Sequence, residues 1–532
     1  MSRAAQDAEF RFNRMMNSRM KIRVVQKQIQ ALPADAVIVN LFEGADMPTG
    51  AAGAVDAALG ATDGIPGDGA ISRLIRLGDF TGKHNEVAVL YTNGLIPSPR
   101  VILVGLGRKE HLTLDRVRQA SGVAARKARD LGCRRVAGVV HGGGMSGLDA
   151  RAAAQAVVEG ALLATYQFRE FKSDGAAQAR NIDDFTLVEF NLSRIQAVSR
   201  GAREGELIAG GVNTARTLIN RPPNHLNPAA LAAWCEEMAA RAHIGCTVYN
   251  EREIAENRMG GLLAVAQGSA NAPRFVILDS KPDGRGQPLV FVGKGVTFDT
   301  GGISLKDPAG MENMKADMGG AAAVIGALQA IGELELPGRA IGLVPLVENM
   351  PGGQAFRPSD VITMMNGTTV EIISTDAEGR LILADALHYA KRYEPRGVVD
   401  LATLTGASVI ALGEGVAASL FSNSEPWAEL ILRSARHCGE RLWRMPLYNE
   451  YGEKLKSDVA DIRNTAARNA GVGISAWFLK RFVETERNKE AYRWAHIDMA
   501  SMMFNTDTKG YQPRGAMGYG VRTLVELARS QE

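Results

Sequence analysis

The chain has 532 residues, of which 46% are hydrophobic and 22% are charged, and its formal net charge is +3. A chain of this length usually needs two or more hydrophobic cores, and its small net charge gives no strong attraction for nucleic acid. No apolar run reaches the roughly 18–20 residues needed to span a membrane, and the four scattered cysteines favour the reducing environment of the cytoplasm.

The N-terminal part of the chain divides into a short leader and an α/β pattern. Residues 1–20 carry both arginines and acidic residues, so we expect a loosely ordered extension rather than a transit peptide. Residues 21–195 alternate helical patterns, at 114–131 and 150–166, with apolar runs typical of buried strands at 36–39, 87–90, 101–104 and 136–140. This alternation predicts an N-terminal α/β domain with a mainly parallel sheet.

A long helix over about 195–218 is expected to link this domain to the rest of the chain. Residues 196–532 again alternate, with strands predicted near 275–278, 289–292, 340–345, 398–401 and 496–499. We therefore expect a larger C-terminal α/β domain with a central mixed sheet, and we place the catalytic machinery in it because the polar motifs lie there.

The first polar motif follows the apolar strand predicted at 288–292. Lys294 and Asp299 come directly after this strand, and Lys306 lies seven residues beyond Asp299. Asp317 stands just before a helix of small residues that is expected to begin at 321. These side chains share an environment rich in glycine, where charged groups can approach one another closely.

The second polar motif lies between a predicted strand at 370–373 and a predicted helix at 381–393. Asp376, Glu378 and Arg380 are spaced two residues apart, so an extended backbone would point all three side chains to the same side. We expect this cluster at the carboxyl end of a strand, where α/β folds usually bind their ligands.

Together the two motifs offer carboxylates and lysines without any need for His or Cys. Each acidic residue alone could be a helix cap, a turn residue or a salt-bridge partner. Their grouping at strand ends favours a metal site, since two carboxylates and a guanidinium are costly to bury without counter-charge. Hard oxygen ligands favour Mg²⁺ or Mn²⁺, and Zn²⁺ also accepts carboxylates.

The runs V-G-K-G-V-T-F-D-T-G-G (292–302), M-K-A-D-M-G-G (314–320) and S-T-D-A-E-G-R-L (374–381) resemble the signatures of the leucyl aminopeptidases, also called cytosol aminopeptidases. The resemblance is strong from about Asn213 to the C-terminus, and the N-terminal third matches only in general pattern. One departure is Ser374, where the family usually has Asn; because this position is not a ligand, we expect at most a small change next to the site.

The resemblance implies a two-metal exopeptidase with assigned residues. Two divalent ions (Mn²⁺ or Zn²⁺, with Mg²⁺ possible) would share ligands, the tighter one held by Lys294, Asp299, Asp317 and Glu378, and the more exchangeable one by Asp299, Asp376 and Glu378. Lys306 and Arg380 would be the catalytic pair, with Lys306 stabilising the charge on the substrate carbonyl and Arg380 holding a bicarbonate ion as general base. By the same resemblance Leu404 would offer its backbone N–H to the substrate, and the first side-chain pocket would be lined by Met314, Thr403, Ala500 and Met503.

The resemblance also implies the activity and the assembly. The expected reaction is hydrolysis of peptides with release of the N-terminal amino acid, Leu, Met and other apolar residues being favoured, by a cytoplasmic homo-hexamer. Two other classes stay open. A two-metal phosphoesterase would use similar carboxylates but commonly recruits His or Asn. A DNA-binding role, which some bacterial relatives have, is not supported by the small net charge.

Overall fold

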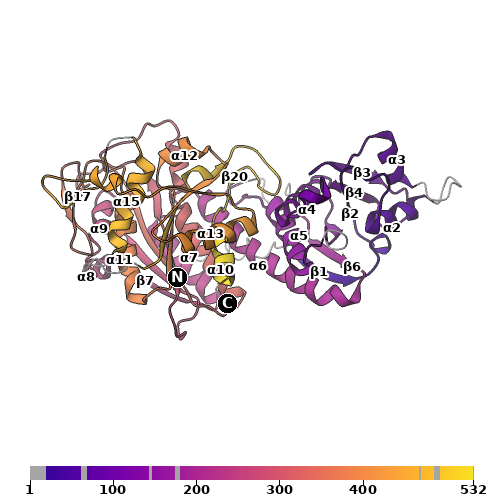
Figure 1. Ribbon diagram of the computed structural model, residues 1–532, viewed down its shortest axis with the longest axis horizontal. Coiled ribbons are helices and arrows are strands. Elements are labelled where there is room, and N and C mark those ends of the chain that lie inside the picture. Colours follow the sequence, from indigo (N-terminus) through magenta and orange to yellow (C-terminus); the bar gives the residue numbers. More distant parts are fainter. Residues whose placement is uncertain are drawn as a thin grey trace. The chain divides into compact units, whose positions relative to one another are not determined.

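The computed structural model describes residues 20–60, 69–142, 147–173, 180–466, 469–484 and 492–530 (Figure 1). The leader expected at 1–20 therefore lies, apart from Met20, outside the described residues. The described chain forms two compact units that divide between Ala209 and Gly210, and residues 507–514 belong with the first unit.

The first unit contains a six-stranded sheet in the order β1-β6-β5-β2-β4-β3. All pairings are parallel except that between β3 and β4, which confirms the predicted mainly parallel sheet. The strands are β1 (Lys21–Gln26), β2 (Ala36–Leu41), β3 (Val87–Tyr91), β4 (Arg100–Gly105), β5 (Arg135–Val139) and β6 (Asp184–Glu189). Of these, β1 and β6 were not predicted from the sequence; both begin or end among polar residues that weaken the strand pattern.

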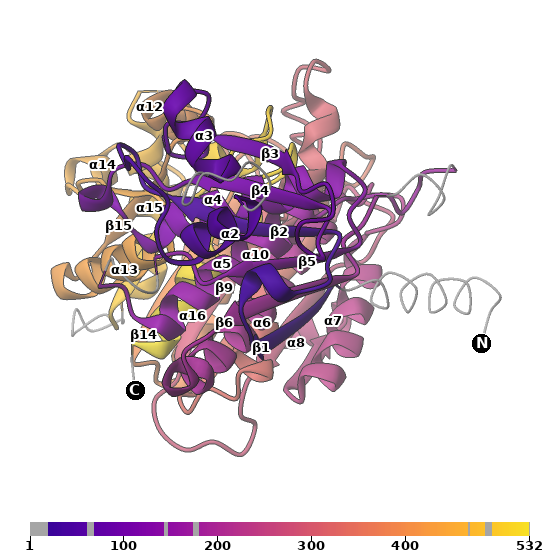
Figure 2. The same cartoon turned by 90° about the vertical axis from the view of Figure 1, so that its right-hand side faces the viewer.

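Helices cover both faces of this sheet, which explains why its strands read as continuous apolar runs (Figure 2). Alternate residues of β2 enter different cores: Ile38 packs with helices α4 and α5, whereas Val37 and Val39 pack with α2 and α3. The helices are α2 (Gly50–Leu59), α3 (Ala70–Leu77), α4 (Leu114–Asp130) and α5 (Ala150–Thr165), followed by the long α6 (Ile195–Asn220), which confirms the predicted linking helix.

The second unit is built on a nine-stranded sheet in the order β16-β15-β18-β14-β9-β11-β8-β7, with β10 also paired to β11. Parallel pairs at its centre, and antiparallel pairs between β15 and β18, β11 and β8, and β8 and β7, confirm the predicted mixed sheet. The strands are β7 (Gly245–Tyr249), β8 (Arg274–Asp279), β9 (Leu289–Gly293), β10 (Gly295–Asp299), β11 (Ala340–Asn349), β14 (Gly397–Ala402), β15 (Ala418–Ser422), β16 (Leu442–Arg444) and β18 (Trp494–Asp498).

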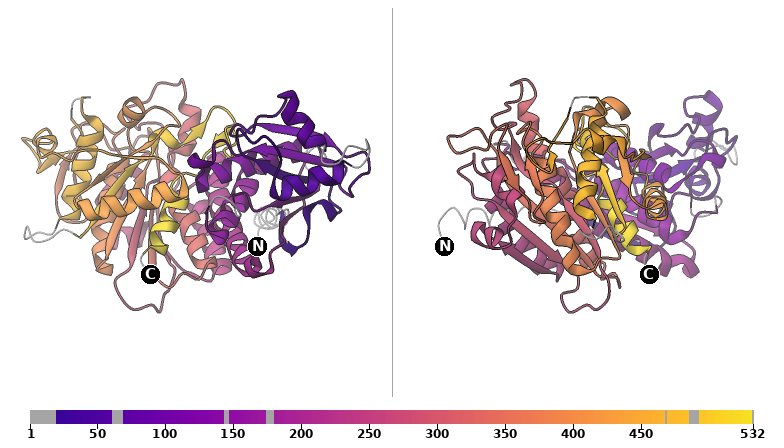
Figure 3. Two further views of the ribbon diagram at one scale, coloured as in Figure 1. Left: turned by 45° about the vertical axis from the view of Figure 1, so that its right-hand side comes forward. Right: turned by 60° about the vertical axis from the view of Figure 1, so that its left-hand side comes forward.

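Helices again lie on both faces of the sheet (Figure 3). Helices α9, α11 and α15 share one core with the strands, while α10 covers the opposite face, where Val324 and Leu328 approach Gly342 of β11. The helices of this unit are α7 (Pro228–Ala242), α8 (Glu251–Glu256), α9 (Gly260–Ala266), α10 (Gly319–Glu333), α11 (Gly379–Ala390), α12 (Gly406–Leu412), α13 (Glu425–Cys438), α14 (Glu450–Glu453), α15 (Gly471–Val483) and α16 (Val521–Arg529). None of the helices described is both long and apolar enough to cross a lipid bilayer.

Two small sheets complete the second unit. Strands β12 (Val361–Thr363), β13 (Thr369–Glu371) and β17 (Ile462–Arg463) form one, and β19 (Phe504–Asn505) and β20 (Gly515–Ala516) form the other. The strand predicted at 370–373 is therefore only partly correct: it belongs to a small peripheral sheet, ends at Glu371, and leaves Ile373 exposed. The third strand of this small sheet, β17, comes from a segment far along the chain, and a pairing between distant segments cannot be seen in local sequence periodicity.

Candidate active site

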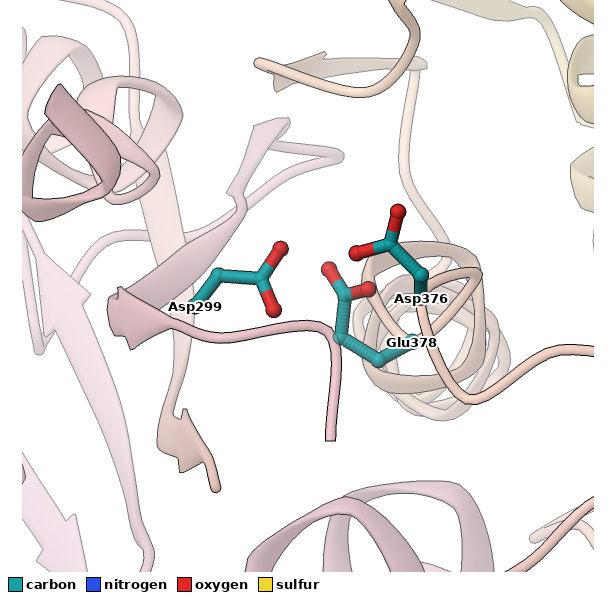
Figure 4. A group of neighbouring side chains, drawn as sticks. All are labelled: Asp299, Asp376 and Glu378. Atoms are coloured by element: carbon teal, nitrogen blue, oxygen red, sulfur yellow. The ribbon is translucent and has the colours of Figure 1, made fainter. Parts of the chain in front are cut away.

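The acidic residues of the two motifs meet at the carboxyl ends of the central strands. Asp299 is the last residue of β10, Asp317 lies two residues before the start of α10, and Asp376 and Glu378 lie between β13 and α11. Figure 4 shows the carboxylates of Asp299, Asp376 and Glu378 turned toward one another. One carboxylate oxygen from each of these three residues lies within 4.8 Å of the others, a spacing that suits a shared metal ion.

The backbone that brings Asp376 and Glu378 together is not extended, so that expectation was wrong. Thr375 and Asp376 form a turn, and Glu378 has right-handed helical angles (φ −77°, ψ −37°) at the start of α11. The two carboxylates approach because the chain reverses between β13 and the helix. At the helix N-terminus the carboxylate of Glu378 is also favoured by the helix dipole.

Lys294 lies at the centre of the acidic cluster. Its Nζ is 2.7 Å from Oδ2 of Asp317 and 2.9 Å from Oε1 of Glu378, and it donates to the carbonyl oxygen of Thr403 at 3.1 Å. The side chain is only 3% exposed. A glycine beside it is required, because a Cβ on Gly379 would lie 2.4 Å from Cε of Lys294.

Lys306 forms the second cationic group of the site. Its Nζ lies 2.9 Å from Oδ2 of Asp299 and pairs with Asp376, and its side chain is 23% exposed. The other oxygen of Asp299 accepts hydrogen bonds from the N–H of Gly301 and from Nδ2 of Asn349, both at 2.8 Å. Asp299 is therefore oriented from both sides, while Lys306 remains accessible.

Electrostatics show that the site lacks positive charge. Burial raises the pKa of Asp317 to about 8, although Lys294 opposes the shift. Burial, strengthened by the neighbouring Glu378, raises the pKa of Asp376 to about 6. In both lysines burial favours the neutral amine, but the surrounding carboxylates prevail and raise the pKa above its usual value. A buried carboxyl group, that of Asp317, whose pKa lies above neutral pH even though it faces an ammonium group indicates room for a further cation.

The donor set fits divalent cations. Four carboxylates of this site face two ammonium groups, and three of the carboxylate side chains are nearly inaccessible to water. Burying so much unbalanced negative charge is unfavourable unless a metal ion compensates it. Oxygen-rich sites of this kind suit Mg²⁺, Mn²⁺ or Zn²⁺.

Arg380 lies one residue beyond the start of α11 and is buried. Its Nη1 donates to the carbonyl oxygen of Asn464 at 2.9 Å, and its Nε has no hydrogen-bond partner among the described residues. Burial lowers the pKa of this guanidinium to about 10, against the attraction of Glu378 and Asp498, so it stays charged near neutral pH. A buried cation with an unpaired N–H is suited to bind an anion.

The residues expected to line the substrate pocket lie on three segments of the second unit. Thr403 donates its hydroxyl hydrogen to Oδ1 of Asp317 at 2.8 Å. The backbone N–H of Leu404, expected to face the substrate, donates instead to Oδ1 of Asp498 at 3.2 Å, and so does the N–H of Ala500. Met314 is half-buried in the 3-10 helix Met311–Ala316, and Met503 is half-buried directly after a second 3-10 helix, Ala500–Met502.

Three residues of the site were missed by sequence reasoning: Asn349, Asn464 and Asp498. All three are buried. Asn349 and Asn464 form hydrogen bonds with the segment that carries Asp376 and Glu378, and Asp498 accepts a hydrogen bond from the N–H of Leu404. Asn349 and Asp498 each end a buried strand of the central sheet, and a polar residue at that place is a signal that could have identified them.

Comparisons with known proteins agree with this geometry. The catalytic-domain model of the cytosol aminopeptidase family matches residues 213–525, and its N-terminal-domain model matches residues 38–175. A probable cytosol aminopeptidase from Roseiflexus castenholzii is 43% identical over 459 residues, which cover 86% of this chain and 92% of the relative. One from Geobacter sulfurreducens is 41% identical over 512 residues, covering 96% of this chain and 99% of the relative.

Solved structures extend the likeness to the fold. A mutant of tomato leucine aminopeptidase superposes with a TM-score of 0.83 at 32% identity, covering 96% of this chain and 97% of that protein. The bottromycin maturation enzyme BotP in complex with Mn superposes with a TM-score of 0.81 at 35% identity, covering 94% of this chain and 99% of BotP.

Proposed function

The chain belongs to the cytosol aminopeptidase family and is an aminopeptidase, a hydrolase, and we propose that it uses two divalent metal ions to release apolar N-terminal residues, Leu and Met foremost, from peptides. The observation that carries the metal dependence is the surplus of buried carboxylates around Lys294 and Lys306. Because BotP was solved in complex with Mn, Mn²⁺ is the first metal to test, followed by Zn²⁺ and Mg²⁺.

The chain offers two overlapping ligand sets. One metal ion would be held by Lys294, Asp299, Asp317 and Glu378, and the second by Asp299, Asp376 and Glu378. Lys294 binds metal only as a neutral amine, so its proton must leave when the metal enters. The close approach of this amine to Asp317 and Glu378 supports its place in the first set.

When bound, such metal ions polarise a carbonyl oxygen and lower the pKa of a water molecule. Lys306 donates hydrogen bonds to the oxygen on which negative charge develops, a role that its partly exposed ammonium group can fill. Its pairing with Asp299 and Asp376 holds this group at the edge of the acidic cluster.

Arg380 would hold a bicarbonate ion, and this ion would supply a general base when bound. Two observations support this role. The Nε of Arg380 lacks a partner among the described residues, and the four carboxylates of the acidic cluster each face a lysine, which leaves none of these four as a free general base. Added bicarbonate should therefore stimulate the wild type and leave Arg380→Ala unchanged. Equal stimulation of both proteins would remove Arg380 from this role.

Met314, Thr403, Ala500 and Met503 line the pocket for the first side chain, and flexible methionines suit Leu or Met side chains. Leu404 would offer its backbone N–H to the substrate, in exchange for the hydrogen bond that this N–H donates to Oδ1 of Asp498. We also propose a cytoplasmic homo-hexamer, on the strength of the family resemblance.

The deciding experiment compares leucyl amide with its N-acetylated form, each assayed with Mn²⁺, Zn²⁺ and Mg²⁺. A free N-terminal amine is required if the enzyme is a metal-dependent exopeptidase, so the acetylated amide should be inert. Comparable rates for the two substrates would contradict the proposal. Hydrolysis of a generic phosphate ester in place of leucyl amide would favour a phosphoesterase.

A further inference from the structure

Asn464 follows β17 and is completely buried. Strand β17 pairs in parallel with β13, where Val370 lies opposite Ile462 and Glu371 opposite Arg463. The main-chain N–H of Asn464 continues this pairing by donating to the carbonyl oxygen of Glu371 at 2.9 Å. Beyond this point regular pairing ends, just before the chain enters the turn that carries Asp376.

The side chain of Asn464 continues the ladder where the backbone stops. Its Oδ1 accepts a hydrogen bond from the N–H of Ile373 at 2.8 Å, and its Nδ2 donates to the carbonyl oxygen of Ser374 at 2.6 Å. The carboxamide thus takes the part of a peptide group from a neighbouring strand. It fixes the chain up to the residue before the Thr375–Asp376 turn.

The same residue also fixes Arg380, because its carbonyl oxygen accepts the hydrogen bond from Nη1. One buried asparagine therefore contacts both the backbone that leads to Asp376 and Glu378 and the guanidinium on α11. We propose that Asn464 is a positioning residue that sets the placement of Arg380 relative to the acidic cluster. This inference rests on the proposed function, since its importance lies in the reaction that these groups perform.

Only asparagine provides this combination at the required length. Asp would keep the acceptor for Ile373 but lose the donor to Ser374 and add a buried charge, and Ala would lose both bonds. A misplacement of about 1 Å can cost roughly a hundredfold in rate. Asn464→Ala should therefore lower kcat by about 10- to 100-fold while changing KM by no more than about threefold.

The chain provides a matched control in Asn423. Its Nδ2 donates to the carbonyl oxygen of Tyr492 at 3.0 Å and its Oδ1 accepts from the N–H of Trp494 at 2.9 Å, so it forms the same double bridge to a backbone. It lies between the end of β15 and the start of β18 and, among the residues that the structure describes, forms no hydrogen bond with the acidic cluster or Arg380. Asn423→Ala should lose thermal stability as Asn464→Ala does, yet keep kcat within about twofold of wild type.

Two measurements on the full chain decide the proposal. The first is a double-mutant cycle that compares kcat of Asn464→Ala, Arg380→Ala and the double variant. The loss of kcat caused by Asn464→Ala should shrink to below about threefold when Arg380 is already replaced by alanine. The second measures the temperature of thermal unfolding as Mn²⁺ is added. The Mn²⁺ concentration that gives half of the full stabilisation should rise at least about tenfold for Asn464→Ala and stay within about twofold of wild type for Asn423→Ala.

Additive effects in the cycle, or equal kcat values together with equal Mn²⁺ midpoints for Asn464→Ala and Asn423→Ala, would overturn the positioning role. If wild type fails to cleave leucyl amide, the proposed function falls, and the Mn²⁺ titration alone decides the positioning role. In that case, equal Mn²⁺ midpoints for the two variants overturn it.

Discussion

At the scale of single residues, the site depends on how closely charged groups can approach. Lys294 reaches Asp317 and Glu378 at ion-pair distance only because the helix beside it starts with glycine. Asp299 is turned by Asn349, whose Nδ2 also donates to the carbonyl oxygen of Thr375 at 3.0 Å. Neutral neighbours therefore orient the charged groups without adding charge to the cluster.

Removing the charge of a ligand tests the metal assignment. Asp376→Asn and Glu378→Gln should each abolish turnover, because a carboxamide carries no charge and binds metal poorly. Initial rates on leucyl amide with saturating Mn²⁺ and the circular-dichroism spectrum give the measurement. Glu425→Gln is the control, since Glu425 is exposed and pairs only with Arg444 among the ion pairs described. Activity above about a tenth of wild type in either ligand variant would refute the assignment.

Space beside Lys294 gives a second test. A Cβ at position 379 would lie 2.4 Å from Cε and 2.8 Å from Nζ of Lys294, so Gly379→Ala should push the amine away from the carboxylates. We expect at least a tenfold loss of kcat with Mn²⁺, although alanine favours helices more than glycine does. Gly338→Ala, whose Cβ would have no neighbour within 4 Å, should leave kcat unchanged. Equal kcat values for the two variants would show that Lys294 can relax.

At the scale of elements, β14 and β18 carry a buried pair beneath the site. Asp400 and His496 lie opposite each other in the parallel register, with Nδ1 of His496 2.5 Å from Oδ1 of Asp400. Nε1 of Trp494 donates to the other oxygen of Asp400 at 2.7 Å. Asp498, at the end of the same strand, accepts the N–H groups of Leu404 and Ala500. The two strands therefore set the position of both pocket segments.

This pair makes stability depend on pH. Burial favours neutral His496, but the carboxylates of Asp400 and Asp498 outweigh burial and the nearby Arg380, and they raise the pKa of His496 above its unfolded value near 6.5. The unfolded chain thus loses this proton at a lower pH than the folded one. The stabilisation of the folded state by protonated His496 is complete below about pH 6.5 and is lost as pH rises through the folded-state pKa.

The free energy of unfolding should therefore fall between pH 6 and pH 9 in denaturant titrations. In Asp400→Asn the loss of the counter-charge lowers the pKa of His496, so the free energy of unfolding should fall less between pH 6 and pH 9. The variant should therefore be destabilised most at pH 6. His437→Gln is a suitable control, because the side chain of His437 is about half exposed and its Nε2 lies 3.8 Å from Oε1 of Glu526. An identical pH dependence in wild type and Asp400→Asn would contradict the role of this pair.

At the scale of the whole molecule, the sheet of the second unit brings the expected ligands from separate parts of the chain together at the carboxyl ends of its strands. Parallel strands β9, β14 and β18 end there together, and β10 and β11 deliver Asp299 and Asn349. Such an arrangement concentrates negative charge in one place. A bound cation is therefore expected to contribute to the stability of the protein as well as to its activity.

Metal removal tests this coupling. A ligand present at a hundred times its dissociation constant stabilises the folded state by about 2.7 kcal/mol. Chelation with EDTA should lower the midpoint of thermal unfolding and abolish hydrolysis of leucyl amide, and added Mn²⁺ should restore both. Calorimetry before and after chelation gives the measurement. An unchanged midpoint together with full activity after verified metal removal would contradict metal dependence.

Much of the architecture follows from local patterns. Apolar runs and helical spacing predicted the two α/β units, because strands buried on both faces and helices with one buried side leave strong periodic signals. The chemistry of the site was also predictable, since Lys294, Asp299, Asp317, Asp376 and Glu378 stand in short motifs beside predicted elements. The structure brings these residues together, and their assignment as ligands stays a prediction.

The tertiary structure alone decided how those groups are held. The acidic pair meets through a turn and a helix start, although its spacing suggested an extended strand. Asn464 lies 84 residues beyond Arg380, and Asp498 lies 94 residues beyond Leu404. Hydrogen bonds over such separations depend on strand order and register, which local sequence patterns do not encode, whereas residue type and spacing determine which chemistry is available.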